Sequence, residues 1–307
     1  MPESTHYIVI AGPTASGKSA LALALAERMS GEIVGCDSVQ LYRKFDVGSA
    51  KPSADELSRV SHHLVDVLDW HEDYDAARYA RDARFAINDI LARRKIPIIV
   101  GGTGLYLRAL LKEAFHDDLP SDEGLRAELQ TQSSVDLFQR LRDCDPKRAG
   151  EIHQNDRFRI VRALELNILL GGPVHEKTSR QIDGASNAEA SIFILDPVRS
   201  VLHDRIALRT KQMLTGGLLD EVSNLIKSGV SITCKPMESI GYKQAAAFLN
   251  GQLAEEFLFD HISAATRQYA KRQCTWFRKV KEGQTLPQNA ALEEHLRLIL
   301  KNIPPKA

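Results

Sequence analysis

The chain has few cysteines, no long apolar run and no excess of either charge. Its four cysteines, Cys36, Cys144, Cys234 and Cys274, lie far apart, with no C-x-x-C pair and no histidine at metal-ligand spacing. This pattern disfavours a zinc site or a disulfide framework and is typical of thiols in a reducing compartment. No apolar run approaches the roughly 20 residues of a membrane span, and residues 1–7 lack the features of a signal peptide. We therefore expect a cytoplasmic protein that does not cross a membrane.

The charges of the chain cancel. Its 307 residues include 40 Lys and Arg and 40 Asp and Glu, so the formal net charge is zero. Nucleic-acid-binding proteins are usually basic, so RNA binding here would need a local basic patch. Apolar residues make up 43% of the chain and charged residues 26%, which is the balance of a globular protein and excludes a mainly disordered one.

Alternating apolar strands and helical segments predict an α/β fold. Residues 6–11, 32–36 and 96–100 are short β-branched runs typical of buried strands, and residues 191–195 add another. Residues 20–28 are rich in Ala and Leu, which is typical of a helix. Strands that alternate with helices form parallel sheets with helices on both faces. We therefore predict a doubly wound parallel sheet.

The pattern between residues 119 and 190 is helical throughout. Leu125, Leu129, Leu137 and Leu141 recur at helical spacing, and a further helix over 159–170 should end at Gly171 and Gly172. We predict two domains. The core contains residues 1–118 and 191–307, with a mostly helical C-terminal part, and residues 119–190 form a helical insertion.

Residues 12–19 read G-P-T-A-S-G-K-S and fit the phosphate-binding pattern G-x-x-x-x-G-K-[ST] between a predicted strand and a predicted helix. The glycines let the loop curl so that backbone N–H groups face an anion, and the helix N-terminus adds its positive dipole end. Lys18 would contact the phosphates, and the Ser19 hydroxyl would ligate Mg²⁺. The pattern predicts a site for a di- or triphosphate, formed by Gly12, Thr14, Ala15, Ser16, Gly17, Lys18 and Ser19.

An acid follows the second predicted strand but not the strand at 96–100. That strand ends in Gly101-Gly102-Thr103, where a P-loop ATPase would normally carry the acid that holds Mg²⁺. Asp37, after the second strand, is well placed to take a proton from an incoming nucleophile. This favours group transfer over a motor ATPase, although a turn or cap role explains Asp37 equally well.

Further motifs follow the phosphate loop in a fixed order along nearly the whole chain. They are D-S-V-Q-L-Y (37–42), G-S-A-K-P (48–52), G-G-T-G-L-Y (101–106), N-D (155–156) with R-I-V-R-A-L-E (159–165), I-G-Y-K-Q (240–244), and T-R-Q-Y-A-K-R-Q (266–273) with T-W and F-R (275–278). The ordered set resembles the tRNA dimethylallyltransferases, also called tRNA isopentenyltransferases, in their compact bacterial form. The resemblance implies a P-loop NTPase-like core.

The resemblance implies transfer of a dimethylallyl group from dimethylallyl diphosphate to N6 of adenosine 37 in tRNA, with release of pyrophosphate. The phosphate loop and Mg²⁺ would hold the diphosphate, and Asp37 would act as general base on the N6 amine. Thr103 is similar to a residue near the reacting centre. Arg205 and, more so, Arg209 would reach the pyrophosphate, although their spacing alone is that of an ordinary solvated helix face.

The resemblance also implies that the anticodon stem-loop of tRNA is a partner, with the adenosine flipped out of its stack. It assigns tRNA binding to Asp37, Ser38, Val39, Gln40, Thr103, Arg126, Phe158, Arg159, Ile160, Val161, Arg162, Gly241, Tyr242, Lys243, Arg267, Lys271, Arg272, Gln273, Trp276 and Arg278. The C-terminal members mix basic and aromatic side chains, as RNA-binding surfaces do, whereas we expect Phe277 in the core. Two positions depart from the family: Phe158 stands where Gln is usual, and Lys243 where many members carry Arg.

Other classes share parts of this pattern. A small-molecule kinase and an adenylate isopentenyltransferase share the phosphate loop and the acid, but the basic and aromatic C-terminal segment weakens both interpretations, and a kinase has no use for the helical insertion either. A purely RNA-binding module would not need Lys18, Ser19 and Asp37 in this arrangement. We therefore expect a monomeric tRNA prenyltransferase whose helical insertion grips the RNA and moves on binding.

Overall fold

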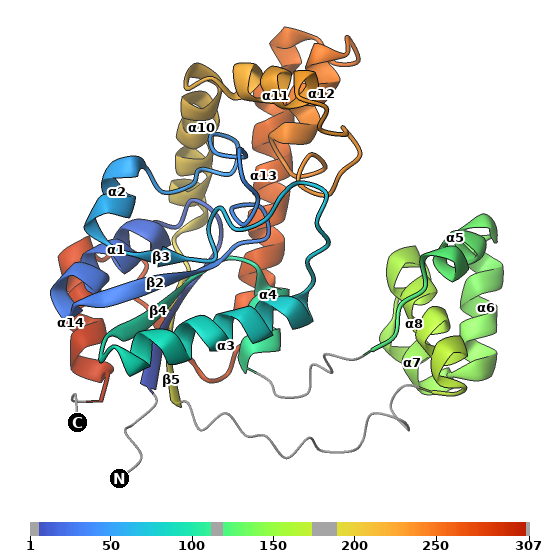
Figure 1. Ribbon diagram of the computed structural model, residues 1–307, viewed down its shortest axis with the longest axis horizontal. Helices are drawn as coiled ribbons and strands as arrows, with labels where there is room; N and C mark the ends of the chain where they lie inside the picture. The colour runs from blue at the N-terminus through green and yellow to red at the C-terminus, as the bar shows by residue number, and fades with distance from the viewer. Residues whose placement is uncertain (1–5, 112–118, 174–188, 305–307) are drawn as a thin grey trace. The chain divides into compact units, whose positions relative to one another are not determined.

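The protein is described by a computed structural model that covers residues 6–111, 119–173 and 189–304 (Figure 1). These residues form two compact units. The larger unit contains residues 6–111 and 189–304, and the smaller unit contains residues 119–173. None of the helices in these ranges is long and apolar enough to span a membrane.

A six-stranded parallel sheet forms the centre of the larger unit. The strands lie in the order β3-β2-β4-β1-β5-β6, with apolar β1 in the interior between β4 and β5. The strands predicted from the apolar runs are confirmed, and β5 begins two residues earlier than predicted. The strands are β1 (His6–Ala11), β2 (Gly31–Cys36), β3 (His62–His63), β4 (Ile96–Gly101), β5 (Glu189–Leu195) and β6 (Gly283–Leu286).

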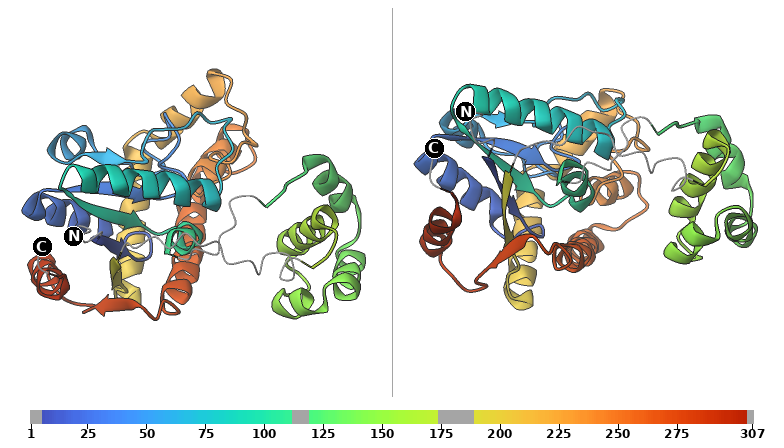
Figure 2. Two further views of the ribbon diagram at one scale, coloured as in Figure 1. Left: turned by 60° about the horizontal axis from the view of Figure 1, so that its bottom comes forward. Right: turned by 90° about the horizontal axis from the view of Figure 1, so that it is seen from below.

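Helices cover both faces of the sheet (Figure 2). On one face, α1 (Lys18–Met29) and α14 (Leu292–Asn302) bury leucines and isoleucines against alternate residues of the central strands. On the other face, α3 (Ala76–Ala92) packs against β2, β4 and α4 (Gly104–Leu111). The predicted doubly wound α/β fold is confirmed.

Helices from the second half of the chain complete the larger unit. α10 (Arg199–Thr215) and the long α13 (Glu255–Phe277) pack side by side through a small apolar cluster that includes Ala15 of the phosphate loop. Phe277, at the end of α13, is buried, as predicted. The remaining helices of this unit are α2 (Ala54–Arg59), α11 (Leu218–Lys227) and α12 (Tyr242–Leu249).

The smaller unit is helical throughout its described residues. Leu129, Leu137, Leu141 and Leu164 meet in its core, and Gly171, at a φ of 66°, ends the helix over residues 157–170 as predicted. Residues 112–118 and 174–188, on which the predicted domain boundaries depend, lie outside the described residues. The helices are α5 (Glu123–Thr131), α6 (Ser134–Cys144), α7 (Pro146–Glu151) and α8 (Arg157–Leu170).

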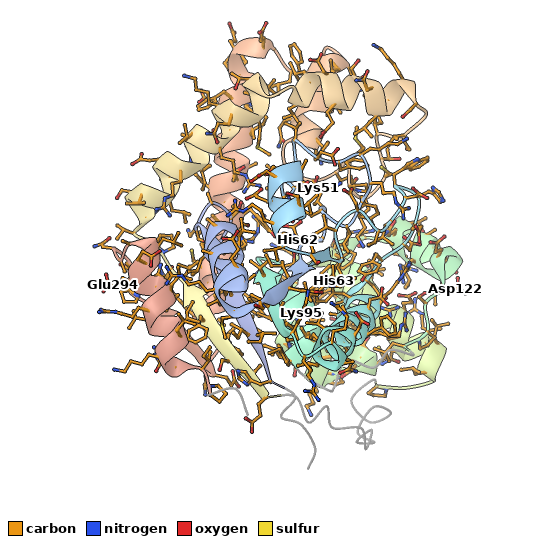
Figure 3. All side chains as sticks on the ribbon, turned by 60° about the vertical axis from the view of Figure 1, so that its left-hand side comes forward. Lys51, His62, His63, Lys95, Asp122 and Glu294 are labelled. Atoms are coloured by element: carbon orange, nitrogen blue, oxygen red, sulfur yellow. The ribbon has the colours of Figure 1, made fainter. Side chains whose placement is uncertain are left out.

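A buried carboxylate connects the strands at the edge of the sheet formed by β3. Glu32 of β2 is 2% exposed and accepts hydrogen bonds from Arg93 and, at 2.7 Å, from Lys95. Its carboxylate also lies 2.7 Å from Nε2 of His63. The hydrogen bonds from Arg93 hold the pKa of Glu32 well below its usual range. His63 and Lys95, labelled in Figure 3, thus connect β3 and the start of β4 to β2.

The close approach of β4 and β2 predicts a strong penalty for a side chain at Gly101. A Cβ there would lie 2.0 Å from the carbonyl oxygen of Cys36, which belongs to a paired strand and cannot move aside. We expect Gly101→Ala to lower the free energy of unfolding by about 1–3 kcal/mol, the usual cost of overpacking. Urea unfolding followed by circular dichroism measures this change.

The matched control is Gly150→Ala. A Cβ at Gly150 meets nothing within 4 Å, and the residue lies in α7. Alanine is the better helix former, so this variant should keep or raise the stability. Equal stability of the two variants would contradict the close contact at Gly101.

Candidate functional site

Three strands of the larger unit end in one row. In the register of the sheet, Ala11 of β1 lies beside Gly101 of β4, and Gly101 lies beside Cys36 of β2. The loops that follow these strands therefore leave the sheet together, at the edge where open parallel sheets bind ligands. They carry the phosphate loop, Asp37 and Thr103, which the sequence predicted to act together.

The phosphate loop has the backbone of an anion site. Gly12, Ala15 and Gly17 have φ angles of 156°, 61° and 93°, so the loop curls through the left-handed region. The N–H of Ser16 donates to the carbonyl of Pro13 at 3.3 Å and closes the turn. Gly17 caps α1 without a side chain, and this leaves the first N–H groups of the helix for an anion.

Cations surround this loop. The ammonium of Lys18 donates to the carbonyl of Pro13 at 3.1 Å, and Arg205 of α10 donates to the carbonyl of Ser16 at 3.1 Å. Burial and, to a smaller extent, the charge of Arg209 lower the pKa of Lys18 to about 8, against the opposing effect of Asp37. Burial also lowers the pKa of Arg209. These groups would be stabilised by a bound anion.

Arg209 is held at this edge by the loop after β2. Its guanidinium donates to the carbonyl of Ser49 at 3.2 Å. The side-chain amide of Gln40 donates to the same carbonyl at 3.1 Å and to that of Ala50 at 3.0 Å. The helix face that carries Arg205 and Arg209 is therefore directed at the predicted site rather than at solvent alone.

Asp37 is both a turn residue and a candidate base. Its Oδ1 accepts the N–H groups of Val39 at 2.9 Å and Gln40 at 3.3 Å, which fixes the carboxylate. Its Oδ2 has no hydrogen bond within the described residues, so one oxygen is left to accept a proton. Thr103 is fixed beside it, because its Oγ1 accepts the N–H of Ser38 at 3.2 Å.

Helix α13 supplies a further wall of the site. Burial raises the pKa of Tyr269 to about 12, and the neighbouring Thr103 partly offsets this rise. Trp276 lies against Gly104, where a Cβ would lie 2.5 Å from the indole. The sequence places Tyr269 in the basic and aromatic C-terminal segment, but the sequence analysis did not assign it to this site.

Two residues expected to contact tRNA are buried and engaged elsewhere. Gln273 is 6% exposed and has both ends of its amide hydrogen-bonded to loops of the site. Tyr242 is 0% exposed and donates to Glu221, while Gly241 holds a φ of 95° at the start of α12. The physical reason is the same for both side chains: each fills the space beside a glycine, Gly102 or Gly48, of a facing loop.

The basic residues of the larger unit that we expect to contact tRNA are mostly exposed. Arg272 lies over the ring of Tyr269, 5.7 Å from its centroid, and Arg278 pairs with Asp196 at 3.2 Å. Arg267 is half-buried on α13, and the side chains of Lys243 and Lys271 are exposed. These side chains provide the local basic surface that a neutral chain would need to bind RNA.

In the smaller unit, the predicted RNA residues separate into exposed and engaged groups. Arg126 and Arg162 both donate to Glu165, which is 0% exposed, at 2.9 and 2.6 Å. Hydrogen bonds from both arginines favour the charged carboxylate and hold the pKa of Glu165 below its usual value against the opposing effect of burial.

At the start of α8, the residues predicted to contact RNA differ in how exposed they are. Phe158 is 81% exposed, and the side chain of Arg159 is half exposed beside Asp156. Ile160 and Val161 are buried in the core of the smaller unit, so their side chains present no group to RNA. An RNA contact at those two positions is left to the backbone.

Comparison with known proteins identifies relatives over nearly the whole chain. The family model described as IPP transferase matches residues 40–280. A protein of Citrifermentans bemidjiense named tRNA dimethylallyltransferase 1 is 44% identical over 89% of both chains. A tRNA dimethylallyltransferase of Desulfosudis oleivorans is 41% identical over 95% of this chain and 94% of its own.

Similar chains among the solved structures carry names of the same kind. The full-length tRNA isopentenylpyrophosphate transferase of Bacillus halodurans is similar with a TM-score of 0.72 and 34% identity, over 97% of this chain and 95% of its own. A eukaryotic dimethylallyltransferase described as acting on tRNA is similar with a TM-score of 0.82 and 28% identity, over 99% of this chain and 81% of its own.

The lowered pKa of Lys18 predicts proton uptake when an anion binds. With a pKa of about 8, the amine is increasingly neutral above pH 8, and a bound anion favours its charged form. We expect binding of inorganic pyrophosphate between pH 8 and 9 to take up more protons in the wild type than in Lys18→Arg, because a guanidinium stays charged throughout. Calorimetry in buffers of different ionisation enthalpy measures the uptake, and equal uptake by both proteins would contradict this assignment.

Proposed function

The chain belongs to the IPP transferase family and transfers a dimethylallyl group to tRNA; we propose that the group comes from dimethylallyl diphosphate and goes to N6 of adenosine 37, with pyrophosphate released. One observation carries the finer part of this proposal. A phosphate loop surrounded by cations and a fixed carboxylate with one unused oxygen leave the sheet at the same edge. Such a site can hold a leaving diphosphate beside a group that accepts a proton.

The donor half of the reaction uses the phosphate loop. Its backbone N–H groups and Lys18 would hold the diphosphate, while Arg205 and Arg209 stabilise the charge that grows on it as the carbon–oxygen bond breaks. Ser19, exposed in the first turn of α1, has a hydroxyl that no hydrogen bond engages within the described residues. This suits Mg²⁺ held mainly by phosphate oxygens and water, which would neutralise further charge on the leaving group.

The acceptor half uses the loops after β2 and β4. A neutral exocyclic amine is a poor nucleophile, so removing its proton as the new carbon–nitrogen bond forms assists the transfer. Oδ2 of Asp37 would accept that proton from N6, and Thr103 would position the flipped adenine beside it. The turn hydrogen bonds to Oδ1 keep the carboxylate from rotating away.

RNA contacts would come from both units. Lys271, Arg272 and Arg278 supply phosphate contacts in the larger unit. In the smaller unit, exposed Phe158 offers an aromatic face on which an unpaired base can stack, and Arg159 lies next to it. An anticodon stem-loop offers both phosphates and unpaired bases, the two kinds of group that these side chains would contact.

Labelled dimethylallyl diphosphate tests the proposed function directly. The purified protein and Mg²⁺ are incubated with an unmodified tRNA that has adenosine at position 37, with the same tRNA carrying guanosine there, with free AMP, or with ATP and no tRNA. We expect label only in the first tRNA, at one adenosine. Label in AMP would move the assignment to adenylate isopentenyltransferases, and consumption of ATP on a small acceptor would favour a kinase.

Replacement of Asp37 separates catalysis from binding. Asp37→Asn keeps an oxygen for the N–H groups of Val39 and Gln40 but removes the base, so we expect kcat to fall by about 10²–10⁴-fold with tRNA affinity nearly unchanged. Single-turnover transfer and filter binding measure the two quantities. Asp204→Asn, an exposed position of α10, is the control. Equal losses of turnover and affinity in Asp37→Asn would refute the base assignment.

A further inference from the structure

The buried amide of Gln273 joins two loops of the active site. Its Oε1 accepts the N–H of Thr14 at 2.8 Å, and its Nε2 donates to the carbonyl of Gly102 at 2.8 Å. We propose that Gln273 is a positioning residue that sets the separation between the diphosphate half and the adenosine half of the site, and not an RNA contact. This inference rests on the proposed function of those two halves.

The surroundings of Gln273 leave its amide no other role. The residue is only 6% exposed, so little of it is accessible to solvent or to a bound RNA. A Cβ on Gly102 would lie 2.4 Å from Nε2, so the amide occupies the space that the missing side chain of Gly102 leaves. One end must accept and the other must donate, and the amide of glutamine does both.

The two hydrogen bonds complete a continuous path across the site. Thr14 belongs to the phosphate loop, and Gly102 precedes Thr103, whose hydroxyl holds the N–H of Ser38 beside Asp37. Reacting atoms must approach to about 3–3.5 Å before transfer, and a misplacement of about 1 Å can cost 10²-fold in rate. A side chain that fixes one loop against the other therefore acts on the chemical step.

Gln273→Glu tests this role through pH. A buried carboxyl has a raised pKa because burial disfavours its charged form. As a carboxylate it repels the carbonyl of Gly102, whereas as a carboxylic acid it accepts from Thr14 and donates to Gly102, as the amide does. We expect the ratio of variant to wild-type kcat to rise as the pH falls from 8 to 6, by about tenfold per pH unit above the pKa of the new carboxyl. Taking the ratio removes the pH dependence of Asp37 itself.

Gln268→Glu is the matched control, since it places the same charge on an exposed position of α13. Its ratio to the wild type should not change with pH. Gln273→Met keeps the shape of the side chain without either hydrogen bond, and we expect it to lower kcat by about 10–10²-fold. In both Gln273 variants we expect the tRNA affinity, measured by filter binding, to stay within about twofold of the wild-type affinity. A twofold change corresponds to about 0.4 kcal/mol.

Binding of inorganic pyrophosphate gives a readout that does not depend on transfer to tRNA. Because Thr14 lies in the phosphate loop, Gln273→Glu should bind pyrophosphate more weakly than the wild type at pH 8 and should recover at pH 6. A kcat ratio and a pyrophosphate affinity ratio that are both independent of pH would overturn the proposal, as would a loss of tRNA affinity at unchanged kcat. If the wild type failed to label tRNA, the proposed function would fail, and the pyrophosphate measurement would still decide the role of Gln273.

Discussion

The parallel pairing of β1 with β4, and of β4 with β2, is the constraint on which the site depends. It places Ala11, Gly101 and Cys36 in one row, so three loops begin at the same edge of the sheet. Toward their carboxyl ends these three strands are apolar and mostly buried, and they offer no side chain for polar chemistry there. The loops at their carboxyl ends therefore receive all of it, as in other open α/β sheets.

Large side chains from the second half of the chain pack against glycines of these loops and fix the positions of the loops. Gly48, Gly102 and Gly104 each leave room for one large side chain, which is Tyr242, Gln273 or Trp276 in that order. The carboxylate of Glu221 adds to this by accepting the N–H groups of Asp46, Val47 and Gly48 at 2.7–3.2 Å. The result is a loop whose Ser49 carbonyl can hold Arg209 in place.

Local patterns predicted much of the fold and the centre of the site. β-Branched runs gave the strands, and the phosphate loop and Asp37 are adjacent to those runs, so their positions followed from them. The orientation of α13 could not be predicted in the same way. Helical spacing shows that Tyr269, Gln273 and Trp276 share a face, but which loop that face meets depends on residues more than 160 positions away. The burial of Gln273 and Tyr242, and the pairing of Arg126 and Arg162 with Glu165, are tertiary facts of this kind.

The hydrogen bond between Thr14 and Gln273 joins residues 259 positions apart in the chain. At a synthesis rate of about 5–20 residues per second, the phosphate loop leaves the ribosome roughly 13–50 s before its partner on α13. During that interval the nascent chain carries the complete phosphate-binding motif but not the helix that holds it against β4. Contacts of such long range also slow folding. The hydrogen bond between Thr14 and Gln273 therefore cannot form until α13 has been synthesised and has folded back onto the phosphate loop.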